Sequence, residues 1–177
     1  MRYFGVFLLA GLIGLGSNFA DARPMHGARH LGNGSQASTT TPRDVRTMFF
    51  SVTLPEGWVS PTRPQKVQNG VHAIFTKGRD ISLAVTCMRG NASAKELAES
   101  TAANMRKDNM EVSEPVADGP FYVIDIKRKD ITGKAWFGAT GANCAVTTIF
   151  GDELAEANPL LQAIKPVQEN LIPREVK

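Results

Sequence analysis

The sequence predicts an α+β domain built on a central antiparallel sheet of about six or seven strands, with helices packed on its faces. Short runs of alternating apolar and polar residues recur along the chain, which is typical of strands. Most of these runs are joined by short connections, and short connections favour antiparallel neighbours because parallel strands need long crossovers. Two other segments have apolar residues at helical spacing and therefore predict helices.

The start of the chain has the features of a cleaved signal peptide. Arg2 supplies a basic start, an apolar run extends over residues 6–15, and the sequence ADA at 20–22 fits the small-x-small cleavage rule. The apolar run is interrupted by glycines and is shorter than the roughly 20 residues that span a membrane. Since no cysteine follows directly, lipid attachment is not expected. We predict cleavage after Ala22 and a periplasmic or secreted protein without a stable membrane span.

Two further parts follow the predicted signal peptide of residues 1–22. Residues 23–44 are rich in glycine, serine and threonine, which predicts a flexible tail. Residues 45–177 have the size of one domain with a single core. The formal net charge of +3 is too small to indicate nucleic-acid binding.

The first half of the domain contains three strand-like runs. FFSVTL at 49–54 alternates in hydrophobicity, and Pro55-Glu56-Gly57 ends it in a turn, so that Trp58 can cover an edge of the core. Residues 70–88 contain two β-rich runs joined by KGRD at 77–80, which predicts a hairpin.

A helix of about 15 residues is predicted over NASAKELAESTAANMRKDN at 91–109. Ser93 and Glu96 have the spacing of a capping box, in which each side chain accepts from the other residue's free backbone amide. Apolar or small residues fall on one face of this helix, namely Ala94, Leu97, Ala98, Thr101 and Met105.

The rest of the domain predicts four strands and a closing helix. The strand-like runs are residues 110–117, 121–129, 133–140 and 144–150, separated by turn-like interruptions. Residues 151–167 then predict a second helical region, with Pro159 near a helix start and leucines on one side.

Cys87 and Cys144 are the only cysteines in the chain. In an oxidising compartment such a pair favours a disulfide, and each cysteine lies in a strand-like run with its side chain on the expected core face. A bridge over this loop would contribute roughly 4 kcal/mol in the chain-entropy model. We predict a structural disulfide; free buried cysteines and a redox or nucleophilic role are the alternatives.

The segment FFSVTLPEGWV at 49–59 resembles the opening strand and Pro-x-Gly-Trp turn of PsbP-like and DcrB-like proteins. The resemblance continues through the hairpin, the helix, the later strands and the Leu-Leu-x-x-Ile ending, and it covers about residues 47–166. It implies a central antiparallel sheet with helices on its faces, in exported proteins that act as accessory or binding factors rather than as enzymes. Many DcrB-like proteins are lipoproteins, whereas this chain lacks the lipid-bearing cysteine.

The histidines form no catalytic or metal-binding motif in the sequence. His26 and His30 stand four apart, but neighbouring glycines disfavour a helix there, and weak copper or nickel binding by the tail is an open alternative. His72 is opposite in phase to its apolar neighbours and is predicted at the surface or at a sheet edge. No catalytic residue, cofactor or metal site is predicted.

These observations favour a non-enzymatic accessory or binding protein of the cell envelope. Its partner would be an envelope protein or a small ligand, and not nucleic acid. Such a factor would present an exposed apolar or basic patch, for which the candidate residues are Trp58, Trp136, Lys127 and Arg128. A thiol-based redox protein and a periplasmic protein that binds a small ligand or a metal are the alternatives.

Overall fold

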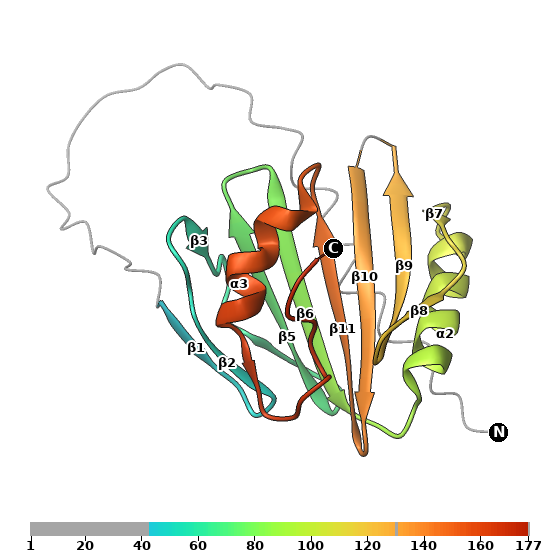
Figure 1. The fold of residues 1–177 in the computed structure, drawn as a ribbon, viewed down its shortest axis with the longest axis horizontal. Coiled ribbons are helices and arrows are strands. Elements are labelled where there is room, and N and C mark those ends of the chain that lie inside the picture. The colour runs from blue at the N-terminus through green and yellow to red at the C-terminus, as the bar shows by residue number, and fades with distance from the viewer. Residues whose placement is uncertain (1–42, 130, 177) are drawn as a thin grey trace, which may run out of the picture.

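The computed structural model describes residues 43–129 and 131–176 (Figure 1). The predicted signal peptide and nearly all of the predicted tail, including His26 and His30, lie outside the described residues. The elements along the chain are β1 (Asp44–Arg46), β2 (Phe50–Thr53), β3 (Trp58–Val59), β4 (Gln65–Val67), β5 (Gly70–Lys77), β6 (Ile81–Arg89), α2 (Ala94–Lys107), β7 (Glu111–Val112), β8 (Val116–Asp118), β9 (Phe121–Arg128), β10 (Ile131–Thr140), β11 (Asn143–Phe150), the 3-10 helix η1 (Leu154–Ala157), α3 (Asn158–Ala163) and β12 (Lys165–Pro166).

The predicted α+β fold with a central antiparallel sheet is confirmed. The main sheet has nine strands, in the order β3-β5-β6-β11-β10-β9-β7, with β4 also pairing with β5 and β8 with β9. All of its pairings are antiparallel. A second, three-stranded sheet has the order β1-β2-β12.

The sheet has more strands than the six or seven predicted because both of its edges are made of short pieces. The predicted strand at 110–117 consists of β7 and β8, which are separated by a segment containing Pro115. Proline lacks the amide proton that a sheet ladder needs, so it interrupts the pairing with β9. At the opposite edge, β3 and β4 likewise share one neighbour, β5.

Both faces of the main sheet carry an apolar cluster. On the face that we call the first face, Phe75, Leu83 and Ile149 pack with the small sheet, α3 and the C-terminal segment. On the second face, Ile124 and Phe137 pack with α2. Figure 1 shows α3 in front of the main sheet and α2 beside β9 at the other end. A sheet that is buried on both faces needs apolar or small residues at successive positions, as in β11.

The predicted hairpin and the predicted central helix are confirmed. β5 and β6 are joined at Gly78, whose positive φ of 63° suits glycine. The helix α2 begins after Ser93, and the capping box with Glu96 is present. The two hydrogen bonds from Ser93 lower the pKa of Glu96. The buried side of α2 contains Leu97, Ala98, Thr101, Ala102 and Met105.

Candidate functional site

The predicted disulfide between Cys87 and Cys144 is wrong in this structure, where both cysteines are free and buried. In the pairing of β6 with β11, Cys87 lies opposite Ala145, and Cys144 lies opposite Met88. Directly paired residues point to the same face and successive residues to opposite faces. The two thiols therefore point to opposite faces of the sheet, Cys87 into the first cluster and Cys144 into the second.

The environment of the two thiols also disfavours redox or nucleophilic chemistry. Burial raises the pKa of Cys87 to about 12, with a smaller contribution from Cys144. Burial likewise raises the pKa of Cys144. Since the thiolate is the reactive form of cysteine, the raised pKa values and the burial of both side chains disfavour their reaction in the folded protein.

We expect reducing agents to leave the stability of the folded protein unchanged, because no bridge constrains the unfolded chain. Urea unfolding should give the same midpoint with and without dithiothreitol. A thiol-specific reagent at pH 8 should modify neither cysteine in native protein and both in unfolded protein that was never reduced. If the thiols became reactive only after reduction, the result would show that the disulfide is present in the protein.

His72 is buried, which corrects its predicted place at the surface or an edge. Only 7% of the residue is exposed. Its strand β5 is interior at this point, because Gln65 of β4 pairs with it on one side and Thr86 of β6 on the other. The ring atom Nδ1 lies 2.9 Å from Oγ1 of Thr86, and Nε2 has no hydrogen-bond partner among the described residues. Sequence alternation failed here because it assumed one solvated face.

Burial lowers the pKa of His72, so the folded protein favours the neutral ring. The unfolded chain then takes up a proton first as the pH falls, and stability decreases below the ordinary histidine pKa of about 6.5. We expect the free energy of unfolding of the native protein to fall between pH 7.5 and 5.5. The variant His72→Gln should show a smaller fall, measured by urea unfolding at each pH. Equal slopes for the two proteins would contradict this account.

The four residues predicted as a binding surface do not form one. Trp58 and Trp136 are 5% and 3% exposed and belong to the first cluster, so they are core residues. Lys127 and Arg128 are exposed but are successive residues of β9 and therefore point to opposite faces. The sequence shows which residues are aromatic or basic, but not that two sheets bury both tryptophans.

Lys127 does line a shallow groove of about 550 Å³ over β9 and β10, bounded by Leu154 of η1. The two lysines that line this groove, Lys127 and Lys134, already lie close to carboxylates within it. Nζ of Lys134 lies 3.4 Å from Oδ1 of Asp125, and Nζ of Lys127 lies 3.9 Å from Oε2 of Glu111. This groove therefore has little uncompensated charge with which to recognise a ligand.

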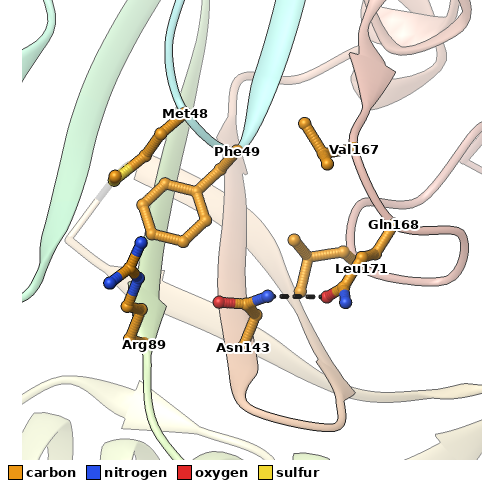
Figure 2. Close-up of a pocket in the computed structure, with 7 residues that line it drawn as sticks. All are labelled: Met48, Phe49, Arg89, Asn143, Val167, Gln168 and Leu171. Atoms are coloured by element: carbon orange, nitrogen blue, oxygen red, sulfur yellow. Dashed lines mark hydrogen bonds between the residues drawn. The ribbon is translucent and has the colours of Figure 1, made fainter.

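A smaller cavity of about 110 Å³ lies where β6 ends and β11 begins (Figure 2). We call it the rim pocket. Its lining comes from three places: the turn between β1 and β2, the ends of β6 and β11, and the segment after β12. The lining residues are Met48, Phe49, Arg89, Asn143, Val167, Gln168 and Leu171.

Hydrogen bonds and core contacts fix the apolar part of the rim pocket. Oγ1 of Thr47 accepts from the backbone amides of Phe49 and Phe50 at 3.1 and 2.9 Å, which shapes the β1–β2 turn. Phe49 and Leu171 are buried in the first cluster. The amide of Val167 donates to the carbonyl of Phe49 at 2.8 Å and so ties the C-terminal segment to the turn.

The polar side of the pocket has one fixed amide and one unpaired cation. Oε1 of Gln168 accepts from Oγ1 of Thr140 at 2.6 Å and from Nδ2 of Asn143 at 2.7 Å, the second of which is dashed in Figure 2. Within residues 43–129 and 131–176, the Nε2 donor of Gln168 has no partner. The exposed guanidinium of Arg89 has none there either. The pocket therefore offers hydrogen-bond donors from two side chains.

Sequence reasoning did not single out any residue of the rim pocket. Arg89 and Asn143 become neighbours only through the register of β6 and β11, in which they pair directly. Gln168 joins them from a segment that lies outside the main sheet. No local motif marks these positions; the exposure of Met48 and Val167, at 58% and 71%, appears only in the structure.

Residues 43–129 and 131–176 contain no group of three or more His, Cys, Asp or Glu side chains that could hold a metal ion. Among these residues no helix has the length and apolar character needed to cross a membrane.

No family model matches the chain, and no curated protein matches it. Among solved structures, the chain is similar to a protein from Bacteroides thetaiotaomicron whose crystal structure is known at 1.50 Å resolution. The identity is 17% and the TM-score is 0.39, and the match covers 68% of this chain and 46% of that one. This chain thus spans less than half of that protein, and a likeness at this level carries no argument about function.

Proposed function

We propose that this chain is a non-enzymatic binding protein of the cell envelope and that its binding site is the rim pocket. Export rests on the signal peptide predicted over residues 1–22. The binding role is supported by one observation above all: the Arg89 guanidinium lines a cavity without a partner among the described residues. An accessory role also agrees with the resemblance of residues 47–166 to PsbP-like and DcrB-like proteins.

The apolar surroundings of Arg89 support the same proposal. Met48 and Val167 line the pocket and are among the most exposed large apolar residues of the described chain. Scattered exposed apolar side chains are common on protein surfaces. Their placement around one cavity with an unpaired cation is typical of a recognition site, where apolar contacts provide affinity and a few polar groups fix orientation.

Thiol-based redox function has no comparable support, since both thiols are buried and their pKa values are raised. Binding of metal by the tail would use His26 and His30, which lie outside the described residues. The rim pocket is therefore the site on which the functional proposal rests.

Site-specific crosslinking in intact cells tests this function. A photoreactive benzoylphenylalanine would replace Met48 at the pocket and, as a matched control, Val116, which is 64% exposed at the β8 edge. We expect one reproducible envelope partner or ligand to be captured from Met48 and not from Val116, and the additional change Arg89→Gln should abolish the capture. Identical capture from both positions would contradict the proposed site.

The predicted export is tested separately on the same cells. The mature protein should be recovered from the periplasmic or secreted fraction. Its intact mass should be that of residues 23–177, a chain that begins at Arg23. Recovery of the uncleaved chain from the cytoplasm would contradict an envelope function, whatever the rim pocket binds.

A further inference from the structure

The lining of the rim pocket favours an anion. Arg89 is the only charged residue among the seven that line it, and no carboxylate faces the pocket from this lining. The Nε2 group of Gln168 adds a neutral donor, because its Oε1 is already occupied by Thr140 and Asn143. A bound anion would accept from the Arg89 guanidinium, and a hydrogen bond to a charged partner is roughly twice as strong as a neutral one.

The number and shape of these donors favour a carboxylate over a phosphate. A guanidinium presents a planar fork of donors that matches the two oxygens of a carboxylate. A phosphate dianion would keep an uncompensated charge beside a single cation.

The apolar residues of the pocket place a further condition on the ligand. Phe49 and Leu171 are apolar lining residues that are buried beneath the surface, and Met48 and Val167 are exposed beside them. A ligand that carries an apolar group close to its carboxylate would contact both parts of this lining.

The C-terminal residue of a polypeptide has this combination, since its carboxylate and its side chain are bonded to the same Cα atom. We infer that the rim pocket binds the C-terminal carboxylate of a partner polypeptide whose last side chain is apolar. This inference rests on the proposed function and specifies its ligand. Arg89 binds the carboxylate, and Met48 and Val167 contact the last side chain.

Peptide binding to the purified mature protein tests the inference. The probe is a fluorescein-labelled peptide of sequence Ser-Gly-Ser-Gly-Leu with a free C-terminus, and its affinity is measured by fluorescence polarisation at low salt. The same peptide ending in a carboxamide, and the same peptide ending in aspartate, are expected to bind at least tenfold more weakly. Equal affinity for the free acid and the carboxamide would overturn the inference.

Two isosteric changes identify the groups involved. Arg89→Gln and Gln168→Glu should each weaken binding about tenfold or more; the second keeps the acceptor oxygen for Thr140 and Asn143 but replaces the Nε2 donor with a repelling oxygen. Arg128→Gln, on the second face and far along the sheet, is the matched control and should leave affinity unchanged. Equal effects of Arg89→Gln and Arg128→Gln would show nonspecific charge attraction and overturn the inference.

Competition distinguishes a polypeptide end from other anions. Unlabelled 4-methylpentanoate carries the carboxylate and side chain of leucine without a peptide bond, and inorganic phosphate carries only charge. Both should compete at least tenfold less well than the unlabelled peptide; equal competition by either would overturn the assignment to a polypeptide.

If no peptide binds while Arg89-dependent crosslinking from Met48 persists in cells, the ligand class is wrong and the binding function stands. Loss of that crosslinking contradicts the function itself.

Discussion

Replacement of Phe75 by alanine is expected to lower the free energy of unfolding by about 3 to 5 kcal/mol. Phe75 is fully buried in the first cluster. Its ring meets that of Phe50 edge to face, with centroids 6.5 Å apart and an interplanar angle of 69°. Since Phe75 belongs to β5 and Phe50 to β2, this contact joins the main sheet to the small sheet. The variant therefore loses apolar burial, leaves a cavity and weakens the attachment of the β1–β2 hairpin.

Urea unfolding monitored by tryptophan fluorescence measures this effect, because Trp58 and Trp136 lie in the same cluster. Val116→Ala is the control: this side chain is 64% exposed, and its loss should change stability by less than about 0.5 kcal/mol. A cost below about 1 kcal/mol for Phe75→Ala would mean that the two sheets do not share a packed core. A double-mutant cycle with Phe50→Leu and Phe75→Leu should give a coupling of about 0.5 to 1.5 kcal/mol.

Replacement of Gly138 by alanine is expected to displace the C-terminal segment from the main sheet. A Cβ atom at this position of β10 would lie 2.5 Å from the carbonyl oxygen of Leu171 and 2.8 Å from that of Asn170. Both neighbours are backbone atoms, so the segment must shift as a whole. We expect a loss of about 1 to 3 kcal/mol in the free energy of unfolding. Because the same segment carries Gln168, the rim pocket should also be disrupted.

Gly90→Ala is the matched control for this prediction, since a Cβ there would lie 3.6 Å from Sγ of Cys144, an ordinary contact distance. Urea unfolding compares the two variants with the native protein. Limited proteolysis should cut residues 165–176 faster in Gly138→Ala than in the native protein or in Gly90→Ala. Equal stability and equal cleavage of the two variants would show that the C-terminal segment does not lie against Gly138 in solution.

The sequence predicted well the elements that local residues determine. The capping box of Ser93 and Glu96 fixes the start of α2, and Gly78 suits the hairpin turn. These features need only residues that are close in the chain, and so does the alternation that marks each strand. The α+β class then follows from the lengths of the connections.

The cysteine prediction failed because strand alternation was judged for each strand separately. Alternation shows which residues of one strand share a face, but the relative phase of two strands depends on their register. Here the register pairs Cys87 with Ala145, and an offset of one residue sends Cys144 to the other face. His72 and Trp136 were misplaced for a related reason, because apolar layers cover both faces and bury positions that a one-sided sheet would expose.

The rim pocket could not be predicted because its residues share no local pattern. Met48, Arg89, Asn143 and Gln168 come from four separate segments. Each alone is an ordinary surface residue for its position. Only the assembled fold leaves one guanidinium without a counter-charge beside two exposed apolar side chains.

The edges of the main sheet limit how this protein can associate with other chains. β3 and β7 have two residues each, and β4 and β8 have three. Such short edge pieces offer no continuous row of free amides and carbonyls on which another strand could align. The edges of the main sheet therefore give neighbouring molecules no template for stacking into fibrils, even at high protein concentration. A polypeptide partner therefore cannot bind to the main sheet by adding a strand to its edge. We expect such a partner to be recognised through side-chain contacts at a localised site.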